Sequence, residues 1–257
     1  KALINKNVCI FPTCRPGREE IIKNIPNIKK VIKSNDIFQE DEAWWAKQCE
    51  NIDIIIHNAW YMDHDHKESI KNIDCLIGSL NLVKGAAKAG VKRFIGIGTC
   101  FEYDLTKRVY SVDTSLKPST NYGAAKAALF TFLSKWLPER SMEFSWCRLF
   151  SIYGEGEDEE RLTAYISKQI INGEIAELTS GKQIRDFLDV TEAGRIIAEI
   201  ALSNKTGPIN VCSGVPMTVR QFAENIAKKY NRLDLLKFGS RQDNPVDPPC
   251  ILGVKNF

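Results

Sequence analysis

The sequence predicts an α/β protein with a doubly wound parallel sheet and a smaller C-terminal lobe. Short apolar runs alternate along the chain with segments of helical periodicity, which is typical of βαβ units. The run Ile52–His57 is largely apolar, as expected of a strand that is covered on both faces. The 257 residues suffice for a main domain and a smaller lobe.

The elements follow from apolar runs and the turn residues that bound them. Helices are expected over 74–89, which ends at Gly90, and over 120–137, between Pro118 and Pro138. Residues 1–4 are typical of the end of an earlier helix. Strands are expected at 8–11, 31–33, 52–57, 94–98 and 146–150.

The domain boundary is expected near residue 152. Residues 1–152 carry the main sheet, and residues 153–257 form mainly the smaller lobe, with some segments returning to the sheet. The acidic run 155–160 marks a loop, and the lobe is expected to contain helices at 161–172 and 218–230.

Composition predicts a soluble cytoplasmic protein without nucleic-acid or membrane partners. The net charge of +3 is spread along the chain, and no apolar run approaches the about 20 residues of a spanning helix. The start shows no secretory signal. Eight scattered cysteines without a CxxC pair indicate reduced thiols. His64 and His66 flank Asp65, but no further ligand cluster accompanies them, so no metal is expected.

One feature of a dinucleotide-binding sheet does not occur in the sequence. Such a sheet opens with a strand, a glycine-rich turn and a helix, whose amides hold the pyrophosphate. No GxGxxG or GxxGxxG pattern is present. We expect roughly 20 preceding residues to carry it, because a sheet without its central strand would have a gap in its core. The alternative is a chain that does not bind a dinucleotide in the normal way.

Tyr122 and Lys126 are the strongest chemical candidates. Four residues apart on a helix, their side chains share one face. A nearby ammonium favours the phenolate and lowers the pKa of a tyrosine, which makes it a general acid or base near neutral pH. Thr99 follows the 94–98 strand at its carboxyl end, where parallel sheets bind ligands, and its hydroxyl can hold a substrate oxygen.

The Tyr-x3-Lys spacing alone is weak, because the chain contains it twice. The second copy, Tyr103 and Lys107, lies in a polar stretch without helical pattern, and we interpret it as chance. For Tyr122 and Lys126, the alternative is a surface pair on an amphipathic helix.

Six segments carry recognisable sequence motifs: Val91–Ile95, Gly98–Tyr103, Pro118–Lys126, Arg148–Gly154, Gly181–Val190 and Gly207–Gly214. Together they resemble the extended short-chain dehydrogenase/reductases, the NAD(P)-dependent sugar epimerases, dehydratases and reductases. The resemblance covers nearly the whole chain. It implies a Rossmann-type domain at 1–152 and a substrate-binding lobe at 153–257.

The resemblance also implies hydride transfer between a nicotinamide and a carbon of a nucleotide-linked sugar. Tyr122 would move the proton, Lys126 would tune it and hold a ribose hydroxyl, and Thr99 would orient the oxygen. Arg185 matches an arginine that holds the substrate diphosphate, for which its planar fork of donors is suited; a surface salt bridge is the alternative. Implied substrate contacts are Trp60, Cys100, Glu102, Ser151, Arg185 and Arg241.

The expected cofactor is NADP, with NAD as the alternative. NAD-binding sheets usually place an acidic residue at the end of the second strand. Here Arg15 and Arg18 follow that strand and no acid does, which suits the extra phosphate of NADP; a solvated turn arginine is the alternative. Further implied cofactor contacts are Asp36, Ile37, Asn58, Ala59, Trp60, Ile97, Tyr122, Lys126, Phe150 and Ile152.

Several residues of this chain differ from the family's usual motifs, and these differences reduce the number of reactions that are expected. Sugar 4,6-dehydratases carry an Asp-Glu pair directly after the threonine, where this chain has Cys100 and Phe101, so dehydration is not expected. Glu102 either touches substrate or caps the strand end. At two positions where the family usually has Asn, this chain has another residue: Cys75 in a helical motif, and Ser151 at a position that faces the substrate.

The sequence therefore predicts a reductase that resembles the sugar 4-ketoreductases of deoxysugar pathways, the abequose-synthase-like group. Three alternatives remain: a nucleotide-sugar 4-epimerase, a reductase of non-nucleotide ketones, and a non-catalytic cofactor sensor or scaffold. The resemblance also implies a homodimer that packs helices 74–89 and 120–137 into a four-helix bundle.

Overall fold

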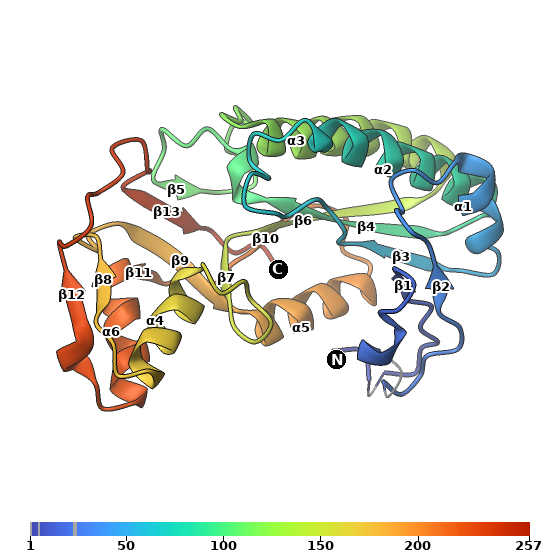
Figure 1. The fold of residues 1–257 in the computed structure, drawn as a ribbon. Coiled ribbons are helices and arrows are strands. Elements are labelled where there is room, and N and C mark those ends of the chain that lie inside the picture. Colours follow the sequence, from blue (N-terminus) through green and yellow to red (C-terminus); the bar gives the residue numbers. More distant parts are fainter. Residues whose placement is uncertain (1, 5, 23–24) are drawn as a thin grey trace. The chain divides into compact units, whose positions relative to one another are not determined.

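The computed structural model describes residues 2–4, 6–22 and 25–257 (Figure 1). The chain forms two compact units. The first comprises Lys1–Glu102, Leu116–Arg148 and Gly194–Ile209, and the second Tyr103–Ser115, Leu149–Ala193 and Asn210–Phe257. The chain passes from the first unit to the second at Leu149, residues 103–115 already belong to the second unit, and residues 194–209 belong to the first. The expected division at residue 152 stays a prediction.

The first unit contains a four-stranded sheet in the order β10-β6-β4-β3. These strands are β10 (Gly207–Val211), β6 (Glu143–Leu149), β4 (Arg93–Thr99) and β3 (Ile54–His57). β3 and β4 are parallel, with Ile55 opposite Phe94. The short strands β1 (Thr13–Cys14) and β2 (Ile32–Lys33) form a separate parallel pair. Order and direction confirm the expected α/β class.

Helices cover both faces of this sheet (Figure 1). α2 (Lys71–Lys88) and α3 (Asn121–Trp136) lie on one face with α1 (Glu42–Gln48), and α5 (Val190–Ala201) lies on the other. Side chains cap the starts of α1 and α3, as Asp41 accepts from Trp44 N at 2.7 Å and Thr120 from Gly123 N at 3.1 Å. Such caps satisfy amides that have no partner within the helix.

The core of the first unit forms where α1, α2 and α3 cover the sheet. α3 contributes Leu129 and Leu133, and β4 and β6 contribute Phe94 and Trp146, all of them completely buried. Short 3₁₀ turns in the described part of this unit are η1 (Glu19–Ile21), η2 (Cys100–Glu102) and η3 (Pro138–Arg140). η2 follows β4 directly, and this places its residues beside the end of the most buried strand.

The second unit is built on a sheet in the order β11-β9-β13-β5, with β7 also paired to β9. α4 and α6 pack their apolar faces, including Ile166 and Phe222, on one another and on β8. The elements are β5 (Val109–Tyr110), β7 (Ser151–Tyr153), α4 (Leu162–Ile171), β8 (Ala176–Leu178), β9 (Ile184–Asp189), β11 (Pro216–Thr218), α6 (Val219–Lys229), η4 (Leu233–Leu235), β12 (Leu236–Phe238) and β13 (Cys250–Gly253).

Several sequence expectations need correction. The strand expected at 8–11 is wrong: only a single bridge joins Ile10 to Ile28, and the regular pairing begins at Thr13. Residues 2–4 form a turn, and Lys1 lies outside the described residues. The sequence analysis missed α1 and α5. Within the described residues, no helix is long and apolar enough to cross a bilayer.

Candidate active site

Thr99 is the last residue of β4 and is buried. Its backbone N–H donates to Glu102 Oε1 at 2.8 Å, so the chain turns tightly from the strand into η2. Its hydroxyl oxygen accepts from the Phe101 amide at 3.3 Å. Because the oxygen serves as acceptor there, the hydroxyl proton is available to a ligand oxygen.

Tyr122 lies in the first turn of α3, and its side chain is buried. The cap by Thr120 fixes where the helix begins, and the Tyr122 amide donates to Lys67 O at 2.9 Å. The phenol ring meets the rings of Trp60 and His66 edge-on, with centroids 6.4 and 5.4 Å away. Gly123 lets the start of α3 lie close to the main chain of η2, since a Cβ there would lie 2.5 Å from Phe101 O.

Lys126 follows one turn later and is only 2% exposed. Its Nζ donates to Ile97 O at 2.6 Å and lies 3.8 Å from the centre of the Trp60 ring. Burial lowers the pKa of Lys126 to about 7, and Glu102 opposes this effect. Tyr122 and Lys126 are thus both interior residues, and this excludes the alternative of a solvated surface pair.

Trp60 is held in place by contacts on several sides. Its Nε1 donates to Asn72 Oδ1 at 2.8 Å, and the amide of Asn72 in turn donates to His66 O and Ser69 O. Phe38 meets the Trp60 ring edge-on. The indole that covers Lys126 therefore has a defined orientation, although the sequence had suggested only ligand contacts for it.

Glu102 lies in η2 and is completely buried. Besides the Thr99 amide, it accepts from Trp146 Nε1 at 3.0 Å and from Arg148 Nε at 2.7 Å. Of the two roles left open by the sequence, the structure supports the strand-end cap, because the carboxylate is enclosed and engaged by three donors. Cys100, another expected substrate contact, is also buried.

The sequence analysis missed this network around Glu102. A signal for it existed: Arg148 lies near the end of an otherwise largely apolar strand, and a buried guanidinium requires an anionic partner. Trp146 gave no such signal. Its indole lies against β4 because Gly96 and Gly98 have no Cβ that would strike it.

The side chains fit a dinucleotide at one point that the structure describes. Lys126 Nζ has three N–H donors and gives one of them to the Ile97 carbonyl, which leaves donors for ribose hydroxyls. Arg15 and Arg18 are exposed just after β1. Asp36 is exposed and accepts from Phe38 N at 3.0 Å.

The remaining expected cofactor residues of the first unit surround β3 and β4. Ile97 is buried within β4 and offers its carbonyl to Lys126. Ile37 is half-buried, as is Ala59, whereas Asn58 is exposed directly after β3. Their roles toward a cofactor stay predictions.

The other expected ligand residues belong to the second unit. Phe150 is buried, and Ser151 and Ile152 are half-buried residues of β7. Arg185 donates to Asp247 Oδ2 at 2.6 Å and to Pro248 O at 2.8 Å. Arg241 is exposed, stacks on the Tyr165 ring and donates to its hydroxyl. Their roles toward a substrate stay predictions.

The second Tyr-x3-Lys copy has a structural role. Tyr103 is completely buried, donates to Asn210 Oδ1 at 2.7 Å and stacks on Tyr110. Lys107 is exposed. This agrees with the interpretation that the spacing arose by chance there.

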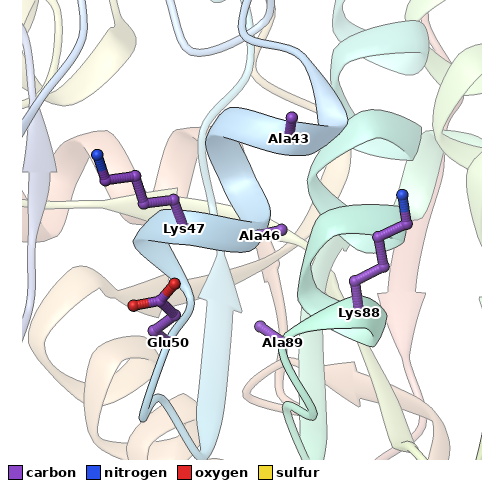
Figure 2. Close-up of a pocket in the computed structure, with 6 residues that line it drawn as sticks. All are labelled: Ala43, Ala46, Lys47, Glu50, Lys88 and Ala89. Carbon is purple, nitrogen blue, oxygen red and sulfur yellow. The ribbon is translucent and has the colours of Figure 1, made fainter.

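A shallow hollow elsewhere in the first unit does not belong to this site (Figure 2). It lies between α1 and the end of α2, and Ala89 leads through Gly90 to the start of β4. Thr99 ends that strand, six residue steps or about 20 Å away. The hollow is lined by Ala43, Ala46, Lys47, Glu50, Lys88 and Ala89.

Comparisons with known proteins show the family and the fold of the chain. A model of the NAD dependent epimerase/dehydratase family matches residues 24–212. Among curated proteins, the chain is 25% identical over 229 residues to dTDP-6-deoxy-L-talose 4-dehydrogenase (NAD(+)) of Aggregatibacter actinomycetemcomitans, covering 86% of this chain and 82% of the relative.

Two solved structures illustrate the fold. UDP-N-acetylglucosamine 4-epimerase from Methanobrevibacter ruminantium M1, in complex with UDP-N-acetylmuramic acid, matches with a TM-score of 0.78 and 22% identity, over 90% of this chain and 76% of that one. dTDP-glucose 4,6-dehydratase from Streptomyces venezuelae, with NAD bound, matches with a TM-score of 0.74 and 17% identity, over 92% and 74%. At such identities the likeness shows the fold.

Proposed function

Because the chain belongs to the NAD dependent epimerase/dehydratase family, we propose that it is an NADP-dependent oxidoreductase that reduces a keto group of a nucleotide-linked deoxysugar. The observation that carries the proposal is the placement of Tyr122 and Lys126. Both are buried on one face of α3, in the same unit as Thr99 at the end of β4. The curated relative is named as a 4-dehydrogenase of a deoxysugar nucleotide, which is the same reaction class.

The reduced nicotinamide, when bound, supplies the hydride that becomes the new C–H bond and is itself oxidised. Thr99 donates its hydroxyl proton in a hydrogen bond to the carbonyl oxygen and orients it. Tyr122 transfers its phenolic proton to that oxygen, so the ketone becomes an alcohol. The ammonium of Lys126 stabilises the phenolate that remains until water returns the proton.

NADP is proposed over NAD because Arg15 and Arg18 are both exposed at the end of β1. Two cations at this position complement the additional phosphate. The name of the curated relative specifies NAD(+), which makes NAD the second candidate.

The test is turnover of a dTDP-4-keto-6-deoxysugar by the full chain, followed through loss of reduced nicotinamide with NADPH and with NADH. We expect one reduced cofactor consumed per alcohol formed, and loss of turnover but not of NADPH binding in Tyr122→Phe. A wild-type protein that binds NADPH but reduces no such sugar would instead favour the non-catalytic sensor or scaffold.

A 4-epimerase is the second candidate, since the structurally similar protein from Methanobrevibacter ruminantium M1 is one. An epimerase takes a hydride from the sugar and returns it, so it interconverts two sugar nucleotides without net use of cofactor. The product ratio in the absence of added NADPH distinguishes the two activities.

We also propose a homodimer through α2 and α3. Ile73 and Ile77 on α2 are about half exposed, and so is Phe132 on α3, which stacks on Trp136. Apolar side chains on two adjacent helices form a patch suited to a second copy. A cytoplasmic location is proposed from the eight cysteines, none of which forms a disulfide.

A further inference from the structure

The segment Gly98–Glu102 closes around one buried carboxylate. Glu102 Oε1 accepts from the Thr99 amide at 2.8 Å and from Trp146 Nε1 at 3.0 Å. Oε2 accepts from Arg148 Nε at 2.7 Å. The side chain is 0% exposed, so contact with a substrate does not account for it.

Gly98 provides the space for this carboxylate. A Cβ at position 98 would lie 2.4 Å from Glu102 Oε1 and 2.2 Å from Trp146 Nε1, which is far inside contact distance. An alanine there would displace the carboxylate from the Thr99 amide. The glycine and the glutamate therefore depend on one another, and the threonine between them is fixed as a consequence.

We propose that Glu102 is a positioning residue of the active site, whose carboxylate fixes the main chain at Thr99 and supplies the anion that balances the Lys126 ammonium. The inference rests on the proposed function, because it assigns Glu102 a role toward the same Thr99 and Lys126.

Trp146 joins Glu102 to Lys126. Its ring centre lies 6.0 Å from Lys126 Nζ, while its Nε1 holds the carboxylate. Burial is the main influence on the pKa of Lys126 and lowers it, and Glu102 is the strongest influence in the opposite direction. Loss of the Glu102 charge therefore lowers the pKa of Lys126 further and reduces the fraction of ammonium at neutral pH.

The other titratable or charged groups near Lys126 do not replace Glu102. His57 on β3 is neutral, since burial lowers its pKa to about 3. Cys75 on α2 affects Lys126 less than Glu102 does, and burial raises the pKa of its thiol. Tyr122 on α3 is the proposed proton donor, and Arg148 on β6 is a cation bound to Glu102 itself.

The first experiment compares wild type with Glu102→Gln, which keeps the shape of the side chain and removes its charge. An amide has one acceptor oxygen where the carboxylate has two, so it cannot accept from all three donors, and the main chain at Thr99 should shift. We expect kcat for the keto-sugar to fall about 100-fold, the effect of a displacement near 1 Å, with a small change in KM. The alkaline limb of the kcat profile should move to lower pH, because Lys126 loses its proton earlier.

Glu143→Gln is the matched control. Glu143 is the first residue of β6 and pairs with the buried Arg93, the first residue of β4. This ion pair therefore lies at the opposite end of the same two strands from Glu102. Removing this anion should leave the alkaline limb where it is in wild type. A limb that moves equally in both variants would overturn the role assigned to Glu102.

Glu102→Gln leaves Arg148 buried without its anion, so the fold itself is at risk. The double variant Glu102→Gln with Arg148→Met removes both charges of the buried pair, which largely cancel at Lys126, so its alkaline limb should stay close to that of wild type while its kcat stays low. Wild-type kcat in the folded double variant, or an unshifted limb in folded Glu102→Gln, would overturn the proposal.

The pH dependence of unfolding provides a readout without turnover. In Glu102→Gln, the rise in unfolding free energy that follows deprotonation of Lys126 should begin at lower pH than in wild type. If wild type reduces no keto-sugar nucleotide, the proposed function fails. An unshifted rise is a separate result, and it refutes the link between Glu102 and Lys126.

Discussion

Replacing Lys126 with methionine should change how the stability of the protein depends on pH. Burial lowers the pKa of the ammonium from its ordinary value of 10.5 to about 7. Between these two values the unfolded chain holds the proton and the native state does not. The unfolding free energy therefore rises as the pH rises through the native pKa, and the cost of the buried charge is present in full only below it.

The magnitude follows from the two pKa values. From about pH 6 to about pH 9, native Lys126 passes from mostly charged to mostly neutral while the unfolded chain stays protonated. At about 1.4 kcal/mol per pH unit, this adds about 2.5 kcal/mol to the stability of the wild type. Lys126→Met lacks this contribution, and the other titrating groups cancel in the difference between the two proteins.

The assay is urea unfolding of both proteins at the two pH values, followed by tryptophan fluorescence. The stability of wild type minus that of Lys126→Met should increase by about 2.5 kcal/mol between the two pH values. Lys92→Met is the control, since Lys92 is exposed and Asp53 raises its pKa, so this lysine stays charged throughout. A difference for Lys126→Met that stays constant with pH would refute the buried-ammonium argument.

Three further predictions concern ligands and assembly. Arg15→Ala with Arg18→Ala should raise KM for NADPH at least about 10-fold relative to KM for NADH, which corresponds to the loss of one charged hydrogen bond. The control is Arg140→Ala, which removes an exposed arginine of η3 and should leave this ratio unchanged. Equal effects on both cofactors would contradict the NADP assignment. Arg185→Ala should weaken binding of a nucleoside diphosphate about 10-fold or more in calorimetry, and unchanged binding would leave Arg185 only its ion pair with Asp247. Ile73→Glu with Phe132→Glu should convert a dimer to monomer in light scattering, whereas Ile171→Glu on α4, also strongly exposed, should not; a wild-type monomer would refute the dimer.

The sequence predicted the bounds of an element well where its apolar residues are buried and clear turn or breaker residues bound it. β4 and α3 lie within one residue of their expected bounds, because one is an unbroken apolar run and the other is bracketed by two prolines. The first strand was misplaced from Thr13–Cys14 to residues 8–11, because apolar residues there are only partly buried and the pairing is short. α1 was missed because its seven residues, two of them tryptophans, are too few to show a helical period in the sequence.

The residues of the candidate site also differ in how far the sequence alone could identify them. Tyr122, Lys126 and Thr99 could be proposed from spacing and strand ends, which are local features. For Glu102 the sequence left two roles open and did not identify its donors, because Trp146 and Arg148 lie more than 40 residues away in the chain. Pairing across strands is set by tertiary structure, and no local pattern encodes it.

Burial of Lys126 is itself an argument for chemistry. A lysine on a helix surface normally extends its ammonium into water, and its long stem makes this easy. Here the ammonium has one carbonyl partner and lies on an indole, in surroundings that lower its pKa to about 7. Such an arrangement destabilises the native state at neutral pH, and strongly perturbed groups of this kind concentrate in functional sites. A structural role would be served at least as well by methionine or leucine. The burial of the ammonium therefore supports the role proposed for it, which is to stabilise the phenolate of Tyr122, one helical turn away.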